Sequence, residues 1–130
     1  MNTEFGFGRI VEYGFEAAID RVTEELAREG FGILTVIDVQ ATLKAKLDKD
    51  MRPYRILGAC NPKLADQAIS AVPEIGLLLP CNVLVREDED DRTHVSFMDP
   101  IAVLGLVGDS RVSALGGTVR QKLKNVMAAL

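Results

Sequence analysis

The chain has 130 residues, of which 48% are hydrophobic and 26% are charged, and its formal net charge at pH 7 is -4. This composition is typical of a globular protein and lies far from that of disordered chains. The negative net charge argues against nucleic-acid binding, because neutralising phosphates requires a surplus of Lys and Arg. The length is that of one ordinary domain, so we expect residues 1–130 to fold as a single domain.

Two features favour a cytoplasmic protein. The longest apolar runs, such as 75–80 and 101–107, fall far short of the roughly 20 residues that span a bilayer. The chain begins with Met-Asn-Thr-Glu and shows no basic segment followed by an apolar stretch, so no secretory signal is expected. Without export, its cysteines are expected to remain thiols.

The N-terminal part predicts a strand followed by a helix. Residues 7–13 are short, β-rich and bracketed by glycines, which favours a strand. Apolar residues then recur at steps of three and four from Phe15 to Leu26, with charged residues between them. This spacing predicts an amphipathic helix, and Gly30 is a suitable residue to end it.

The next stretch predicts a second strand and a short helix. Residues 32–39 are β-rich and almost uncharged, which is typical of a strand buried on both faces. Asp38 can cap a following helix, in which we expect Leu43 and Leu47 to face inward.

A third strand and helix follow the same order. Residues 54–60 predict a strand, and the Asn61-Pro62 pair predicts the start of a helix that runs to about Ala71. Asparagine accepts hydrogen bonds from the first free amides of a helix, and proline suits its first turn. We therefore expect Asn61 to be a helix cap.

The second half predicts an antiparallel hairpin. Residues 82–86 and 94–98 read as strands, and the acidic segment 87–91 between them is expected to be a solvated loop. Asp99-Pro100 repeats the combination of cap and proline before a short apolar helix.

Apolar residues from Val112 to Leu130 keep steps of three and four and predict a long C-terminal helix. The Gly116-Gly117 pair within it predicts a kink or a close helix contact. The whole order, β-α-β-α-β-α-β-β-α, predicts an α+β fold with a single mixed sheet of about five strands and helices packed against it. A long helix on one sheet face leaves other faces to cover, so we expect a two-fold homodimer.

Two segments resemble a known family. The residues Arg-Pro-Tyr-Arg-Ile-Leu-Gly-Ala-Cys-Asn-Pro at 52–62 and Glu-Ile-Gly-Leu-Leu-Leu-Pro-Cys-Asn-Val at 74–83 are similar to the domain of unknown function numbered 302. The similarity extends from about Phe15 to Leu130. It implies a small α+β domain that tends to form homodimers, and it implies no settled activity.

Two Cys-Asn pairs are the main candidates for a functional site. Cys60-Asn61 and Cys81-Asn82 each lie at the end of a predicted sheet element, so two thiols and two amides can converge at one sheet edge. One interpretation is that both cysteines are small buried hydrophobic residues. Another is thiol chemistry, with Cys60 as nucleophile beside a helix N-terminus and Cys81 as its resolving partner.

A third interpretation is a soft-metal site for copper or zinc. Structural zinc takes four ligands, and the chain offers only Cys60, Cys81 and its single histidine, His94. No Cys-x-x-Cys motif is present, although two thiolates can hold copper(I). His94, beside the acidic loop, is expected to be a surface residue. No dinucleotide-binding loop or Ser-His-Asp order is found, and we expect no cofactor.

A basic turn adds a candidate anion site. Arg52, Tyr54 and Arg55 can hold a carboxylate or phosphate, whereas the alternative is that the arginines pair with Glu74 or Asp66. The sequence thus predicts a homodimeric binding or interaction domain for a small anionic or metal-bearing ligand, without chemistry of its own. The alternatives are a thiol-dependent redox enzyme or sensor and a copper- or zinc-binding protein.

Overall fold

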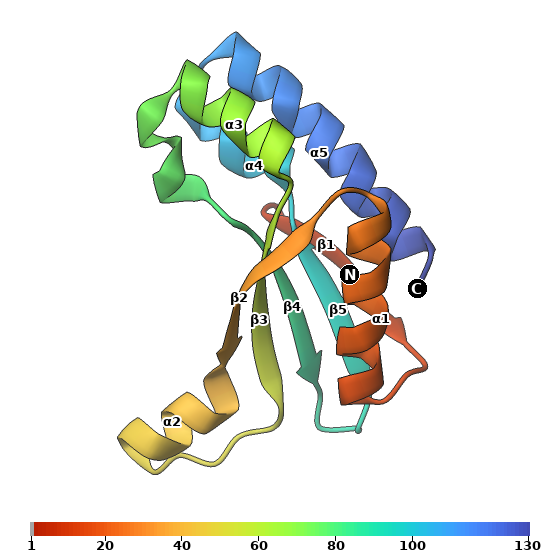
Figure 1. The fold of residues 1–130 in the computed structure, drawn as a ribbon. Helices are drawn as coiled ribbons and strands as arrows, with labels where there is room; N and C mark the ends of the chain where they lie inside the picture. Colours follow the sequence, from red (N-terminus) through yellow and green to blue (C-terminus); the bar gives the residue numbers. More distant parts are fainter. Residues whose placement is uncertain (1) are drawn as a thin grey trace.

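The computed structural model describes residues 2–130 and contains five strands and several helices (Figure 1). In chain order the elements are β1 (Gly6–Val11), α1 (Phe15–Arg28), β2 (Gly32–Asp38), α2 (Val39–Leu47), β3 (Tyr54–Cys60), α3 (Pro62–Ala71), the short 3-10 helix η1 (Pro73–Leu78), β4 (Cys81–Glu87), β5 (Thr93–Met98), α4 (Pro100–Leu104), the 3-10 helix η2 (Gly105–Val107) and α5 (Ser110–Ala128). The α+β class, the five strands and the long C-terminal helix are confirmed.

The strands form one sheet in the order β1-β5-β4-β3-β2. All four pairs of neighbouring strands are antiparallel, whereas the sequence predicted a mixed sheet. The alternation of strand and helix resembles the pattern of parallel crossovers, but α1 here carries the chain from one edge of the sheet to the other. From β2 to β5, each strand lies beside the strand that precedes it in the chain and runs in the opposite direction.

The main core lies between one face of this sheet and the helices α1 and α5. Alternate residues of the central strands point into it, as the period of two in a strand requires. They include Val83 and Val85 of β4 and Val95 and Phe97 of β5, all of them buried. The opposite face of the sheet carries no helix over its central strands, and we call it the open face (Figure 1).

The predicted helix caps are present. The side chain of Asp38 accepts a hydrogen bond from the Ala41 amide at 2.9 Å, and that of Asp99 accepts one from the Ile101 amide at 2.9 Å. Gly30, which follows α1, has a φ of 86°. Only glycine adopts this left-handed conformation without strain, which explains why the helix ends there.

β2 and α2 differ from the sequence-based expectation. β2 was expected to be buried on both faces, and this is wrong, because β2 is an edge strand and lies mostly outside the helical cover. Leu34 and Val36 are 66% and 59% exposed. No residue of α2, which the structure describes completely, is buried, so Leu43 and Leu47 do not join the core. α2 extends away from the rest of the molecule (Figure 1).

α5 runs through its two glycines without a break. A Cβ atom at position 116 would lie 3.1 Å from the carbonyl oxygen of Pro100 in α4, whereas one at position 117 would meet nothing within 4 Å. The predicted close helix contact is therefore confirmed, and Gly116 is the residue that makes it.

None of the helices within residues 2–130 combines the length and apolar character that crossing a membrane requires.

Candidate functional site

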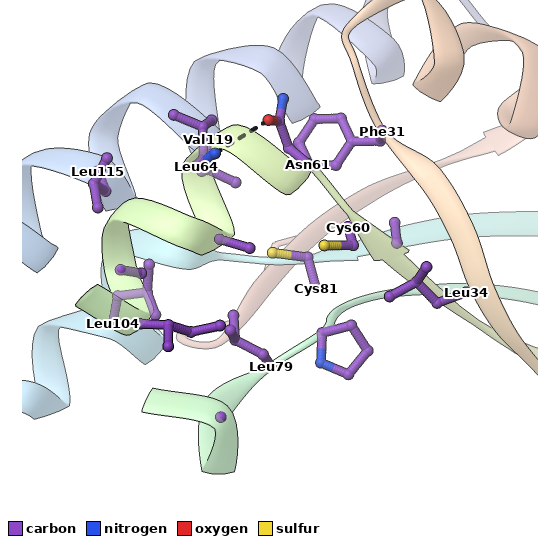
Figure 2. Close-up of a pocket in the computed structure, with 16 residues that line it drawn as sticks. Phe31, Leu34, Cys60, Asn61, Leu64, Leu79, Cys81, Leu104, Leu115 and Val119 are labelled. Carbon is purple, nitrogen blue, oxygen red and sulfur yellow. Dashed lines mark hydrogen bonds between the residues drawn. The ribbon is translucent and has the colours of Figure 1, made fainter. Parts of the chain in front are cut away.

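An apolar cavity of about 320 Å³ lies where β3 ends and β4 begins (Figure 2). We call it the cysteine cavity. Its walls come from β2, β3, β4, α3, α4, the segment around η1 and one side of α5. They include Phe31, Leu34, Leu64, Leu79, Leu104 and Val119. The cavity forms because α3 and α5 pack over the ends of the strands and enclose a space that the small side chains of Ala65 and Ala68 do not fill.

Both cysteines line this cavity, as expected from their positions at strand ends. Ala59 is the register partner of Cys81, so Cys60 lies one residue beyond that pair on the neighbouring strand. Figure 2 shows both sulfur atoms inside the cavity. Both residues are free thiols; Cys60 is half-buried and Cys81 is buried. The structure thus places the two sulfurs in one shared space.

Burial raises the pKa of the Cys81 thiol to about 11, and the neighbouring Cys60 contributes to this rise. An apolar environment disfavours the thiolate, because a buried charge loses its hydration. Cys81 therefore stays protonated at neutral pH and is a poor nucleophile. Cys60, which is the more exposed thiol and lies just before α3, is the better candidate for thiol chemistry.

Asn61 lines the same cavity but serves the fold. Its side-chain oxygen accepts a hydrogen bond from the Leu64 amide at 3.3 Å, and its side-chain nitrogen donates one to the carbonyl of Glu29 at 3.4 Å. The residue caps α3, as predicted, and fastens the start of that helix to the end of α1.

Asn82 does not join the other three residues. It is the register partner of Gly58 and lies on the open face, because successive side chains of β4 point to opposite faces of the sheet. The convergence of two thiols and two amides is therefore limited to Cys60, Cys81 and Asn61.

Arg52, Tyr54 and Arg55 do not form one anion site. Arg52 is paired with Glu87 and Asp91. Arg55 lies on the helix-covered face of the sheet, where its guanidinium donates to both carboxylate oxygens of Glu16, at 2.7 and 3.0 Å. The arginines pair with acids, as the alternative held, but not with Glu74 or Asp66.

Arg55 also lies over the ring of Phe15, with 5.2 Å between the guanidinium carbon and the ring centre. This stacking and the ion pair with Glu16 join β3 to α1, so Arg55 has a structural role.

Tyr54 contributes instead to a second cavity, of about 600 Å³, on the open face. We call it the open-face groove. The register partner of Tyr54 is Arg86, which also lines the groove. Arg86 was not among the residues predicted from the sequence. The signal that could have found it is the hairpin around the acidic loop, whose register places Arg86 opposite His94.

His94 is buried, contrary to the expectation of a surface residue. Its Nε2 lies 2.7 Å from a carboxylate oxygen of Asp88, and its Nδ1 lies 3.4 Å from a guanidinium nitrogen of Arg86. The hydrogen bond from His94 holds the pKa of Asp88 well below its usual range, helped by the backbone amides of Arg92 and Asp90.

The structure does not bring His94 to the cysteines. Arg86, its register partner, is five residues along β4 from Cys81, which corresponds to roughly 17 Å of extended strand. Among the residues that the structure describes, no group of three or more His, Cys, Asp or Glu side chains could hold a metal ion. A zinc site made from Cys60, Cys81 and His94 therefore does not form.

These features define a small α+β domain with an antiparallel sheet, helices over one face and an apolar cavity at the strand ends. The family model described as domain of unknown function DUF302 matches residues 7–130, so the chain belongs to this family.

The crystal structure of an uncharacterised conserved DUF302 protein from Bacillus stearothermophilus is similar, with a TM-score of 0.90 and 25% sequence identity, over 98% of each chain. The comparison with curated proteins gave no match. The family thus accounts for the fold and brings no activity with it.

Proposed function

We propose that the protein is a homodimeric binding domain whose cysteine cavity takes a small apolar ligand. The observation that carries this proposal is the cavity of about 320 Å³ and the character of its walls. This volume lies at the lower end of the range that is usual for small-molecule sites.

The walls favour an apolar ligand over an anionic one. The lining residues, all within the described chain, include no charged side chain, and the Asn61 amide is engaged by Leu64 and Glu29. An anion here would lose its hydration without gaining a partner, which is costly. Two thiols add polarizable surface, which suits an aromatic or sulfur-containing molecule.

Toluene is a suitable probe, titrated by NMR into the purified protein. We expect saturable shifts of the amide signals around Cys60 and Cys81. Ala65→Leu places a larger side chain in the cavity and should remove this binding, whereas Ala17→Leu, on the exposed side of α1, should retain it. No binding by the wild type, or equal binding by Ala65→Leu, contradicts the proposal.

The dimer is supported by the exposed apolar surface of β2. Leu34, Val36 and Ile37 are exposed on an edge strand, whose outer backbone groups also lack a neighbouring strand within residues 2–130. Such an edge invites pairing with another chain. Leu34 and the exposed Ile69 both lie at the cysteine cavity, so a partner on β2 would also cover the ligand.

A second copy is the partner that we propose, with β2 pairing antiparallel to the same strand of the other molecule about a two-fold axis. Val36→Lys should then yield monomers in light scattering, since it places charge in the interface. Leu106→Lys, at a more exposed leucine on η2, is the control and should leave the dimer intact. A monomeric wild type, or a dimer that survives Val36→Lys, would contradict this interface.

A second candidate function is a thiol redox sensor, favoured by the two thiols in one cavity. Glutathione disulfide would supply the oxidising equivalents. The Cys60 thiolate attacks it and releases one glutathione thiolate. Cys81 then gives up its proton and attacks the Cys60 sulfur of the mixed disulfide, which releases the second.

The readout is the mass of the intact protein, which falls by two hydrogens when the disulfide forms. Cys81→Ala should stop at the glutathione adduct on Cys60. A wild type that keeps both thiols under excess glutathione disulfide rules this candidate out.

A further inference from the structure

The open-face groove runs along β4 from Asn82 to Arg86. These residues are four apart, so the groove follows roughly 13 Å of strand. Its floor is apolar, with Ile56 and Leu84 in the middle. At the end near Asn82, the apolar side chains of Phe5, Met98 and Val103 enclose it. The polar end is formed by Arg86 and its register partner Tyr54.

Arg86 differs from most arginines of this protein. Arg52, Arg55 and Arg120, for example, are each paired with a carboxylate. Within the described part of the chain, the side-chain hydrogen-bond partner of Arg86 is the Nδ1 atom of His94, at 3.4 Å. A half-buried guanidinium without an acid carries a positive charge that an anion can neutralise.

The arrangement around His94 keeps Arg86 in this state. The guanidinium has only donors, so Nδ1 of His94 must be the acceptor and the ring proton lies on Nε2. Nε2 then donates to Asp88 at 2.7 Å. The carboxylate of Asp88 is thereby bound to His94 and to Arg92, and not to Arg86.

We propose that the open-face groove binds a small carboxylic acid with an apolar body, whose carboxylate is held by Arg86. The hydrocarbon part lies over Ile56 and Leu84, and Tyr54, the register partner of Arg86, supplies a hydroxyl as a further donor. This site is separate from the cysteine cavity and does not depend on the function proposed for it.

The test uses calorimetric titration of the whole protein with octanoate, 1-octanol and acetate. Octanoate should bind, whereas octanol lacks the charge and acetate lacks the apolar chain, so both should bind at least tenfold more weakly. Arg86→Met should weaken octanoate binding by roughly tenfold to hundredfold, as expected for a lost charge-assisted hydrogen bond. It should leave octanol binding nearly unchanged.

Arg9→Met is the matched control, because Arg9 is an exposed arginine outside the groove whose guanidinium donates a hydrogen bond to the backbone carbonyl of Met127. It should bind octanoate like the wild type. If Arg86→Met does not fold, as judged by circular dichroism, Leu84→Glu provides the same test by placing a negative charge on the groove floor, and it should abolish octanoate binding.

Three results would overturn the proposal. The first is that octanoate does not bind the wild type. The second is that Arg86→Met and Leu84→Glu both bind octanoate as well as the wild type. The third is that Ala65→Leu, which fills the cysteine cavity, removes octanoate binding while Arg86→Met retains it, since the acid then occupies the other cavity.

Discussion

At the scale of single residues, the two cysteines that line the cysteine cavity differ in their exposure to solvent. Cys81 is 7% exposed and Cys60 is partly open to solvent, although they line the same space. Burial raises the pKa of Cys81 to about 11, with a smaller contribution from Cys60. The difference arises from the end of the strand, where Cys60 lies at the border of the packed core and Cys81 lies within it.

The raised pKa of Cys81 predicts a loss of stability at alkaline pH. Below pH 9 the thiol is protonated in both states, so its contribution to stability is fully present. As the pH rises from about 9 to about 11, the unfolded chain ionises first, and the free energy of unfolding falls by about 2 kcal/mol.

The measurement is urea unfolding of the wild type and of Cys81→Ala at several pH values. The difference between the two should change through this window, because all other titrating groups are shared. A constant difference from pH 7 to pH 11 would show that Cys81 titrates normally in the folded protein.

At the scale of elements, the packing of α5 against α4 explains one of two adjacent glycines. Gly116 is buried and faces the carbonyl of Pro100, whereas Gly117 has open space where a Cβ would lie. The first glycine permits a close approach of the two helices. The second has no such reason in the structure.

Gly117→Ala should therefore raise the free energy of unfolding by about 1 kcal/mol, which is the difference in helix propensity between the two residues. Gly116→Ala should raise the free energy of unfolding clearly less, or lower it. The Cβ atom of the new alanine would lie 3.1 Å from the backbone oxygen of Pro100, which cannot easily move. Urea unfolding of the two variants measures this. Equal gains at both positions would mean that α4 and α5 leave room for a Cβ atom at position 116.

At the scale of the whole molecule, the helices cover one face of the sheet and leave the rest open. The solvent-accessible area is 7330 Å², compared with about 6,800 Å² expected for a compact monomer of this mass. The excess fits an extended β2 and α2, whose apolar residues remain outside the core. A partner molecule on this surface would cover the exposed apolar residues of β2.

If that partner is a second copy, thermal stability will depend on protein concentration, because the folded dimer is favoured by mass action. We expect the Tm of the wild type to rise over a hundredfold increase in concentration, and that of Val36→Lys to stay constant. Scanning calorimetry at two concentrations makes the comparison. A wild-type Tm that does not move would argue against a dimer that is coupled to folding.

The sequence by itself determined the local structure and placed each cysteine at the end of a strand. The caps at Asp38, Asn61 and Asp99 and the helix end at Gly30 all lie where they were predicted. These features depend on residues a few positions apart, so they are visible in the chain. The position of each cysteine at a strand end is also a local property, whereas their meeting in one cavity depends on the antiparallel pairing of β3 with β4.

Only the tertiary structure decided which surfaces are exposed and which charged groups meet. The apolar pattern of residues 32–38 is compatible both with a central strand and with an edge strand. Leu34 and Val36 are exposed because the strand order places β2 at the edge of the sheet. Strand register sends Asn82 away from Cys81 and places Arg86 beside His94. These partners are far apart in the chain, and each arginine could pair with any of many Asp and Glu residues. No local sequence pattern therefore shows which pairs form.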